Sequence, residues 1–231
     1  MTAPVITIDG PSGSGKGTIC SLLAAELGWH LLDSGALYRL VAFGAQKHQI
    51  DYTDSEKLAD YAKNLDIRFD VSQANSETGA TEVAVILEGT AVGDGIRTEK
   101  CGNNASKVAA VPAVRAALLE RQHQFLADPG LIADGRDMGT VVFPEAKLKI
   151  YLTASPLERA KRRFKQLKEK GIESTIAALE LEISERDERD MNRPVAPLKP
   201  AEDALVIDTS TMPIGEVIEH VLKLYRQVFK P

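Results

Sequence analysis

Glycines and one lysine near the start of the chain have the types and spacing needed to bind phosphate. In the stretch GPSGSGKGT, the residues Gly10, Gly15 and Lys16 match the spacing G-x-x-x-x-G-K. A β-branched run at 5–8 precedes the glycines and a helical pattern at 16–27 follows them. Because a turn between a strand and a helix exposes N–H groups at the positive end of the helix dipole, the pattern predicts a polyphosphate-binding loop. The alternative, an ordinary glycine turn with a solvated lysine, is disfavoured by this context.

The residue after Lys16 is Gly17, where the common form of the motif has Ser or Thr. Without that hydroxyl the loop is a poor direct ligand for Mg²⁺, so we expect the ion to keep more of its waters and to bind through substrate phosphates. Thr18 is near enough to the helix N-terminus to hydrogen-bond a phosphate. A loop that reads GKGT resembles that of nucleoside monophosphate kinases more than that of switch GTPases or motor ATPases.

Strand and helix patterns alternate along the chain, which favours an α/β fold. Short apolar runs predict strands buried in a parallel sheet, and the runs with helical spacing between them predict helices on its faces. The expected strands span 5–8, 29–33, 131–134, 148–152 and 204–208. The expected helices span 16–27 with Gly28 as a stop, 34–48 with Ser34 as N-cap, 54–64, 98–108, 112–127, 174–191 and 214–229.

Two segments interrupt this alternation. The strand-like runs 67–71 and 82–88 are joined by the polar, turn-prone segment 72–81, which predicts a small antiparallel hairpin inserted into the main domain. The segment 156–170 is strongly basic, with seven Lys or Arg against Glu158 and Glu169. We interpret it as a short helical lid, and the alternatives are a solvated helix face or an RNA-binding patch.

Composition limits the class of protein only broadly. A chain of 231 residues with 44% hydrophobic and 26% charged residues is ordinary for a soluble protein with one large domain. The formal net charge of -5 gives no overall reason to expect nucleic acid or membrane binding. The 2 cysteines, Cys20 and Cys101, form neither a disulfide framework nor a zinc site, and the 4 histidines are scattered. Since the chain shows no signal-peptide pattern and no apolar window long enough to span a bilayer, we expect a cytoplasmic protein.

Beyond the phosphate loop, four further stretches closely resemble the bacterial cytidylate kinase family in order and separation. They are DSGALYR (33–39), NNASKVAAVPAVR (103–115), LIADGRDMGTVVFP (131–144) and SERDERDMNRPVAPL (184–198). The resemblance covers nearly the whole chain. It implies a P-loop kinase fold, which is a five-stranded parallel sheet flanked by helices with an inserted antiparallel β region and a short helical lid. It also implies transfer of the γ-phosphate of ATP to CMP or dCMP.

The resemblance also implies how the chain is organised. The expected core comprises 1–38, 90–155 and 172–231, the monophosphate-binding insert lies at about 39–89, and the lid at about 156–171. Two features depart from the family pattern: the turn 72–81 is long, and Cys101 with Gly102 stand where better helix formers are expected. From the family and from the lack of an obvious exposed apolar stripe, we expect a monomer.

Site residues are transferred from the family to the positions that match its motifs. A nucleoside monophosphate is already largely dianionic at neutral pH, with a second pKa of about 6, so catalysis depends on positioning and charge neutralisation rather than on a strong base. The expected ATP-binding residues are Gly10, Pro11, Ser12, Gly13, Ser14, Gly15, Lys16, Gly17 and Thr18. The expected CMP-binding residues are Ser34, Arg39, Ser106, Arg115, Arg136, Asp137, Arg186, Asp190 and Arg193. The expected catalytic residues are Lys16, Arg136, Arg193, Arg159 and Arg163.

Within the CMP set, the resemblance assigns separate tasks. Three arginines grip the acceptor phosphate, because a guanidinium donates two N–H groups in one plane; they are Arg39, Arg136 and Arg193. Three residues read cytosine, whose amine and ring acceptors complement a carboxylate and a guanidinium; they are Ser106, Arg115 and Asp137. Arg186 and Asp190 are placed at the ribose hydroxyls. Mg²⁺ accompanies ATP, and we expect no direct protein ligand to it.

Each assignment has a structural alternative. A single arginine can form a surface ion pair, Ser106 can be a helix-surface serine, and Arg186 with Asp190 can form an i,i+4 salt bridge. At the level of function, the alternatives are another P-loop small-molecule kinase with UMP, AMP or shikimate as acceptor, and a nucleotide-binding switch or RNA-binding module without turnover.

Overall fold

The computed structural model describes residues 3–70, 84–169 and 171–229. The chain divides into two compact units. The first, called the sheet unit, comprises Met1–Ser34 and Arg121–Pro231, and the second, called the helical unit, comprises Gly35–Glu120. The assignment of a core, an insert and a lid is a functional one and stays a prediction.

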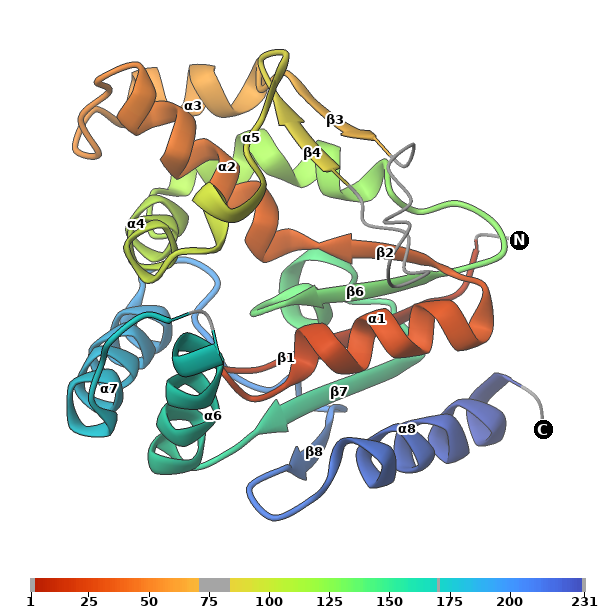
Figure 1. The fold of residues 1–231 in the computed structure, drawn as a ribbon. Coiled ribbons are helices and arrows are strands. Elements are labelled where there is room, and N and C mark those ends of the chain that lie inside the picture. The colour runs from red at the N-terminus through yellow and green to blue at the C-terminus, as the bar shows by residue number, and fades with distance from the viewer. Residues whose placement is uncertain (1–2, 71–83, 170, 230–231) are drawn as a thin grey trace. The chain divides into compact units, whose positions relative to one another are not determined.

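The sheet unit contains five parallel strands in the order β2-β6-β1-β7-β8 (Figure 1). Their bounds are β1 Val5–Asp9, β2 His30–Asp33, β6 Leu131–Gly135, β7 Leu148–Thr153 and β8 Leu205–Asp208. The predicted five-stranded parallel sheet is therefore confirmed. Strands β1 and β6 are buried along their whole length, which explains why their sequences are nearly continuous apolar runs rather than alternating ones.

Two helices pack on the sheet and share one apolar core with it. They are α1 (Lys16–Leu27) and α8 (Ile214–Phe229), and Leu23 of α1 and Val221 of α8 are fully buried beside Ile8 of β1. Helix α8 buries one face, which includes Val217, Val221 and Tyr225. Burying one such aliphatic side chain contributes about 1.5–3 kcal/mol to folding.

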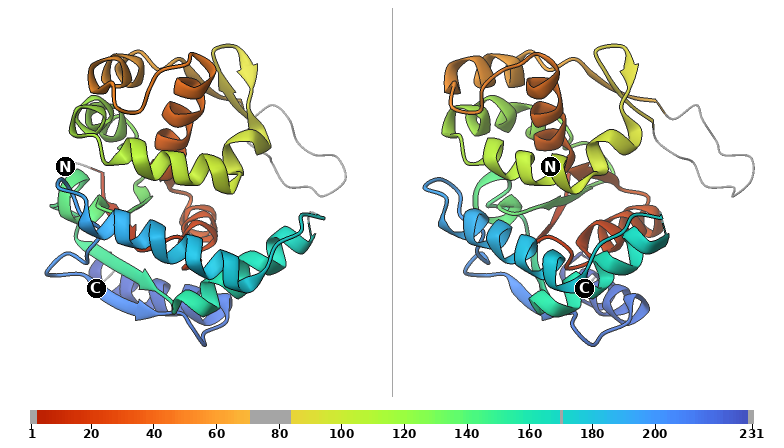
Figure 2. Two further views of the ribbon diagram at one scale, coloured as in Figure 1. Left: turned by 90° about the vertical axis from the view of Figure 1, so that its left-hand side faces the viewer. Right: turned by 60° about the vertical axis from the view of Figure 1, so that its left-hand side comes forward.

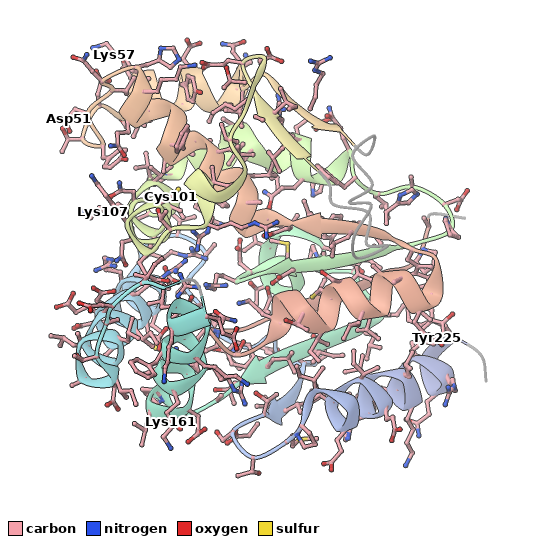
Figure 3. The ribbon with its side chains drawn as sticks, in the orientation of Figure 1. Asp51, Lys57, Cys101, Lys107, Lys161 and Tyr225 are labelled. Carbon is pink, nitrogen blue, oxygen red and sulfur yellow. The ribbon has the colours of Figure 1, made fainter. Side chains whose placement is uncertain are left out.

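The end of α1 follows the prediction made from its glycine. Gly28 has a φ of 63°, and its N–H points to the carbonyls of Ala24 and Ala25. A left-handed residue of this kind ends a helix because it turns the chain away while satisfying the last carbonyls. The next residue, Trp29, packs edge-to-face on Tyr225 of α8 with ring centroids 5.6 Å apart, which ties this turn to α8. Tyr225 is labelled in Figure 3.

Helices α6 (Pro156–Glu169) and α7 (Ile176–Asn192) lie side by side (Figures 1 and 2). They share a small apolar core that includes Ala160 and Ile183. Thr175 caps α7 by accepting a hydrogen bond from the N–H of Ala178 at 3.2 Å. The basic residues of α6 divide between those directed at the phosphate loop, described below, and exposed ones such as Lys161 (Figure 3).

The helical unit contains a small antiparallel sheet in the order β3-β4-β5 together with most of the remaining helices. The predicted hairpin is confirmed by β3 and β4, and the segment 72–81 that joins its strands lies outside the described residues. The elements are α2 Ser34–Lys47, α3 Ser55–Lys63, β3 Ile67–Asp70, β4 Ala84–Leu87, β5 Thr90–Ala91, the 3₁₀ turn η1 Gly93–Arg97, α4 Glu99–Ala109 and α5 Pro112–His123.

Several predicted boundaries are corrected by these elements. Helix α2 begins at Ser34 itself, so Ser34 is its first residue rather than its N-cap, and α5 ends at His123 rather than at 127. Strand β5 and the turn η1 were not predicted, because two and five residues carry too little periodicity to show. Among the described residues, no helix has the length and apolar character required to cross a bilayer.

Helix α4 is continuous through the two poor helix formers. Thr98 caps it by accepting from the N–H of Cys101 at 3.1 Å, and both Cys101 and Gly102 are buried. Because packing supplies more helix stability than intrinsic propensity does, burial of this face outweighs the cost of a glycine. The doubt about this helix that the sequence raises is thereby resolved.

Glu88 links three elements of the helical unit. Its carboxylate accepts hydrogen bonds from Lys47 at 2.7 Å, from His48 at 2.7 Å and from the Tyr61 hydroxyl at 2.8 Å. The bond from Lys47 is the largest cause that lowers the pKa of Glu88 to about 2. A Cβ at Gly44 would lie 1.7 Å from the Tyr61 hydroxyl, so only glycine leaves room for this arrangement.

Candidate nucleotide-binding site

The phosphate loop connects β1 to α1 at the carboxyl edge of the sheet. Gly10 has a φ of 150°, and a Cβ there would lie 2.0 Å from the carbonyl oxygen of Leu152, so only glycine fits. The N-cap of α1 is Gly15, with a φ of 93°. Because this cap carries no side chain, the first N–H groups of α1 keep their capacity to bind an anion.

Lys16 is the first residue of α1 and is buried, with 6% of its surface exposed. Its Nζ donates to the carbonyl of Pro11 at 3.0 Å, so the ammonium lies within the loop. Burial lowers the pKa of Lys16 to about 8, and the charge of Arg136 lowers it further while Asp134 opposes the shift. An incoming polyphosphate would raise this pKa again by adding negative charge beside the ammonium.

Gly17 lies beside a carboxylate that the sequence analysis did not select. A Cβ on Gly17 would lie 3.5 Å from Oδ2 of Asp134, the fourth residue of β6. Asp134 is buried, with 9% of its surface exposed, and burial raises its pKa to about 7 although Lys16 opposes the shift. An acidic group therefore lies directly beside position 17.

Arg159 of α6 is buried against the phosphate loop. Its Nη1 donates to the carbonyl of Ser12 at 3.0 Å, its Nε to the carbonyl of Ala154 at 2.9 Å and its Nη2 to Asp187 of α7 at 2.5 Å. Only 3% of the Arg159 side chain is exposed. In this arrangement Arg159 supports the loop, whereas Arg163, one turn later, donates to Gln166 on the outer part of α6.

Arg162 and Thr209 form a second support that the sequence analysis missed. The Thr209 hydroxyl donates to the carbonyl of Ser14 at 3.0 Å, and Arg162 donates to that carbonyl at 3.3 Å and to the Thr209 hydroxyl at 3.1 Å. Arg162 also donates to the backbone carbonyl of Thr209. Thr209 follows the last residue of β8, so its position at the carboxyl edge was the one available signal.

Replacing Thr209 with valine is expected to raise the KM for ATP about fivefold to twentyfold, because the Ser14 carbonyl loses one of its two donors. The KM for CMP should change less than about twofold, since the Ser14 carbonyl that loses a donor belongs to the phosphate loop. Steady-state kinetics with each nucleotide varied in turn measures both values. Thr209→Ser keeps the hydroxyl and should restore the wild-type value; equal effects of Thr209→Val on the two nucleotides would contradict this role.

Two ion pairs hold the predicted acceptor residues of the sheet unit. The Arg136 Nε donates to Asp190 at 3.1 Å, and the Arg193 Nη2 donates to Asp137 at 3.4 Å. The charge of Asp190 is the main cause that raises the pKa of Arg136 against the effect of burial. The Asp137, Asp190 and Arg193 side chains are almost wholly buried, so these pairs differ from the surface ion pairs of the structural alternative.

Arg186 of α7 contacts the phosphate loop. Its Nη1 donates to the Ser12 hydroxyl at 3.1 Å, while Asp190 accepts from Arg136. Together with Arg159, it brings two guanidinium groups to one residue of the phosphate loop. The loop is thus surrounded by cationic side chains from α6 and α7.

The remaining predicted residues belong to the helical unit, apart from Ser34, whose hydroxyl donates to Gln122 within the sheet unit at 2.7 Å. Arg39 donates to the carbonyls of Ile96 at 2.7 Å and Thr98 at 3.1 Å, at the start of α4. Ser106 on α4 and Arg115 on α5 are buried, with 5% and 7% of their surfaces exposed. Arg115 donates to the carbonyl of Ala109 at 3.3 Å and lies over the ring of Tyr38, 5.5 Å from its centroid. Ser106 is therefore not the surface serine of the structural alternative.

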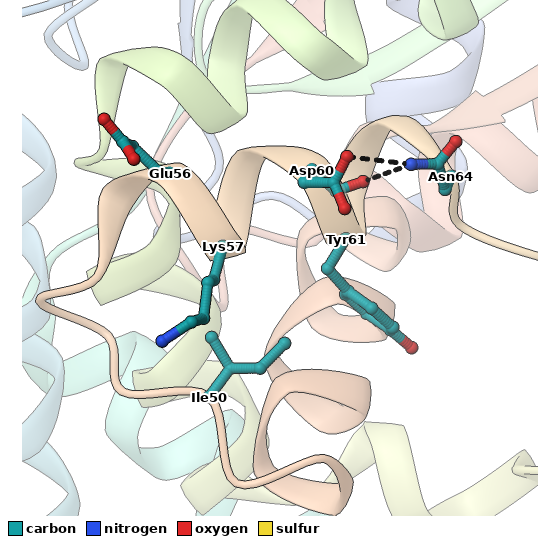
Figure 4. Close-up of a pocket in the computed structure, with 6 residues that line it drawn as sticks. All are labelled: Ile50, Glu56, Lys57, Asp60, Tyr61 and Asn64. Carbon is teal, nitrogen blue, oxygen red and sulfur yellow. Dashed lines mark hydrogen bonds between the residues drawn. The ribbon is translucent and has the colours of Figure 1, made fainter.

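A pocket of about 490 Å³ lies on α3 of the helical unit (Figure 4). Its polar side chains already interact with neighbours: Asn64 donates to the carbonyl and the carboxylate of Asp60 at 3.0 Å, and Lys57 pairs with Asp54 at 2.7 Å. Ile50 and Tyr61 complete much of the lining. The pocket contains none of the predicted site residues and gives no reason to place chemistry there.

Comparison with known proteins finds the family model described as "Cytidylate kinase" over residues 6–227 of this chain. The cytidylate kinase of Aeromonas hydrophila is 58% identical over 225 residues, which are 97% of this chain and 95% of the relative. That of Shewanella sp. strain MR-7 is 58% identical over 97% of this chain and 96% of the relative. That of Serratia proteamaculans is 56% identical over 98% of this chain and 96% of the relative.

Proposed function

The chain belongs to the cytidylate kinase family, and from this premise we propose how it transfers the γ-phosphate of ATP to CMP or dCMP, giving ADP and CDP or dCDP. The observation that carries the proposal is the position of Lys16. It lies buried at the N-terminus of α1, inside a glycine loop at the carboxyl edge of a parallel sheet. This is where α/β proteins bind nucleotides, and where N–H groups and an ammonium together neutralise a polyphosphate.

The residues of the loop and its surroundings divide the work between two nucleotides. The loop N–H groups and Lys16 hold the β- and γ-phosphates of ATP, while Arg136 and Arg193, with Arg39 from the helical unit, aim the acceptor phosphate. Arg159 and Arg163 add positive charge as the phosphoryl group moves. Because the acceptor phosphate is already an anion near neutral pH, these residues orient and neutralise, and no general base is required.

Recognition of the acceptor nucleoside is assigned to the other predicted residues. Asp137 accepts from the exocyclic amine of cytosine, and Ser106 and Arg115 donate to its ring acceptors. Arg186 and Asp190 bind the ribose hydroxyls. Uracil presents a carbonyl where cytosine has its amine, so UMP would offer Asp137 no hydrogen bond from its base at this position and is the weaker acceptor.

Mg²⁺ enters with ATP, and the residues around Gly17 fit that manner of binding. A Cβ at position 17 would lie 3.5 Å from the Asp134 carboxylate, so this acidic group lies close to the loop that would hold the phosphates and their Mg²⁺. Among the described residues, no group of three or more His, Cys, Asp or Glu could hold a metal ion directly. When bound, Mg²⁺ supplies charge neutralisation to the phosphate oxygens. Asp134 would then accept hydrogen bonds from the waters of the ion.

A coupled assay of ADP release tests the function and the acceptor class together. Purified protein with Mg-ATP is expected to use CMP and dCMP, with a kcat/KM for UMP about tenfold to a hundredfold lower because one hydrogen bond to a charged group is lost. AMP and shikimate should give no more ADP than background. Absence of CMP-dependent ADP release would overturn the function, and a preference for UMP, AMP or shikimate would reassign the acceptor.

We further propose that the protein acts in the cytoplasm as a monomer that binds neither nucleic acid nor membranes. A formal net charge of -5 supports the absence of general electrostatic attraction to polyanions. Gel filtration at several protein concentrations tests the oligomeric state. Titration with labelled RNA at two salt concentrations tests the alternative reading of the basic helix α6.

A further inference from the structure

Asp9 is a buried carboxylate that the proposed chemistry does not use. It ends β1 and directly precedes Gly10 of the phosphate loop, with 4% of its surface exposed. Its Oδ1 accepts from the N–H of Met138 and its Oδ2 from the N–H of Gly139, both at 2.8 Å. One side chain thus joins the strand that carries the phosphate loop to a segment 129 residues away.

The segment that Asp9 holds is a single π-helical turn, η2 (Met138–Val142). The N–H groups of Val141 and Val142 both donate to the carbonyl of Asp137, as expected where a helix is widened. A Cβ on Gly139 would lie 2.9 Å from the Thr7 hydroxyl oxygen, so the turn is pressed against β1. Its geometry therefore depends on contact with β1 as well as on its own hydrogen bonds.

The two residues that immediately precede this turn are Arg136 and Asp137, proposed above to aim and to recognise CMP. Their side chains pair with Asp190 and with Arg193. Their backbone is anchored by the two bonds from Met138 and Gly139 to Asp9. The ion pairs hold the side chains and Asp9 holds the backbone that follows them, so we expect the position of both side chains to depend on the Asp9 carboxylate.

Burial of this carboxylate is costly. Burial raises the pKa of Asp9 to about 6 even though two N–H bonds favour its charged form. Asparagine has nearly the same shape and would avoid that cost, but its amide oxygen replaces only one of the two acceptors and its NH₂ group would face a backbone N–H. A bidentate acceptor for two consecutive N–H groups requires a carboxylate at this position.

We propose that Asp9 is a positioning residue that sets the Arg136–Asp137 segment for CMP from the strand that carries the ATP phosphate loop. This inference rests on the proposed function. The main chain of Asp9 pairs with Gly135 and Tyr151 in the sheet whatever its side chain is. Loss of the carboxylate should therefore disturb the CMP site more than the ATP site.

The decisive experiment compares Asp9→Asn with Asp208→Asn, the same change at the exposed end of β8, where Asp208 accepts from Ser210. Isothermal titration at pH 8 with CMP and with a non-hydrolysable ATP analogue gives the two dissociation constants. In Asp9→Asn the Kd for CMP is expected to rise about tenfold to a hundredfold and that for the ATP analogue less than about threefold. In Asp208→Asn both should stay within about twofold of wild type.

A pH series separates a charge-dependent role from a merely structural one. We divide the kcat/KM of wild type for CMP by that of Asp9→Asn at each pH. The effect of the ionisation of CMP on kcat/KM cancels in this ratio, because the substrate is the same for both proteins. As pH falls from 8 to 5 the Asp9 carboxylate gains a proton and loses one acceptor, so the ratio should fall towards one. The other ionisable groups that interact with Asp9 are present in both proteins: Lys16, Cys20, Asp134, Asp137 and Tyr151.

Three outcomes would overturn the inference: an unchanged Kd for CMP, an equal rise for both nucleotides, or a ratio that does not change with pH. If Asp9→Asn does not fold, as judged by thermal unfolding, Gly139→Ala displaces the same N–H groups and should show the same selective loss for CMP. The proposed function fails separately, because a wild-type protein that neither binds nor phosphorylates CMP refutes it whatever the variants do.

Discussion

Replacing Lys16 with methionine is expected to lower kcat about a hundredfold to a thousandfold while the protein stays folded. The ammonium lies at the N-terminus of α1, within the loop that would enclose the transferring phosphate. Charge on the phosphate oxygens is redistributed as the bond to ADP breaks, and a fixed cation in a water-poor site stabilises that state strongly. Loss of one preorganised donor of this kind costs a factor of about 10²–10³ in kcat.

The stability of the same variant should stay equal to that of wild type or increase. Burial lowers the pKa of Lys16 to about 8, which means that the empty loop disfavours its charge. Methionine fills nearly the same volume without a charge to desolvate, so the free energy of unfolding at pH 7 should rise by about 0–2 kcal/mol. Urea unfolding measures this value, and coupled kinetics measures kcat on the same preparation.

Lys149→Met is the matched control for Lys16→Met. Lys149 lies on β7 of the same unit, is similarly buried with 9% of its surface exposed, and donates to Asp203 at 3.0 Å away from the phosphate loop. Its kcat should stay within about twofold of wild type. Unchanged turnover in Lys16→Met, or an equal loss in the control, would refute the assignment of Lys16 to phosphate.

Local patterns were sufficient to predict the sheet and the phosphate loop. The three central strands, β1, β6 and β7, are short apolar runs whose burial on both faces leaves that pattern in the sequence. Gly10, Gly13 and Gly15 of the loop have positive φ, and a Cβ on Gly10 would also lie 2.0 Å from the carbonyl oxygen of Leu152. Features written into consecutive residues could therefore be recognised without a structure.

Contacts between distant segments could not be predicted in this way. Asp9 and Met138 lie 129 residues apart, and Thr209 and Ser14 lie 195 apart. The residues next to an aspartate at the end of a strand, or to a threonine just after one, do not indicate which distant backbone groups its side chain will bond. The basic run on α6 shows the same limit, because its spacing does not reveal that Arg159 and Arg162 contact loop carbonyls whereas Lys161 is exposed.

The second large effect concerns Asp134, and its sign is opposite to that of acids whose pKa is lowered by ion pairs or hydrogen bonds. Its pKa is raised by burial from 3.8 to about 7, so the folded protein retains a proton that the unfolded chain has released. Where the folded state binds more protons, the free energy of unfolding falls as pH rises. The contribution of Asp134 should therefore be most favourable below about pH 4 and should be lost between about pH 4 and pH 7.

Asp134→Asn removes this penalty and is expected to raise the free energy of unfolding by about 2–4 kcal/mol at pH 8, since each pKa unit corresponds to about 1.4 kcal/mol. The difference from wild type should shrink towards zero at pH 4, where both side chains are neutral. Urea unfolding of the nucleotide-free proteins across this range measures the effect. An equal difference at all pH values, or destabilisation at pH 8, would contradict the assigned ionisation.

The same variant should also lose the proposed interaction of the Asp134 carboxylate with the waters of Mg²⁺. If Asp134 accepts hydrogen bonds from the waters of Mg²⁺, then Asp134→Asn should show a smaller rise in melting temperature on addition of Mg-ATP and a kcat lower by about tenfold to a hundredfold. Metal-free ATP should raise the melting temperature of both proteins equally. A gain in stability together with loss of this magnesium-dependent shift would mean that Asp134 lowers the free energy of unfolding but contributes to the binding of Mg-ATP. Its carboxylate lies 3.5 Å from where a Cβ of residue 17 would be, beside the position at which the common motif has a hydroxyl.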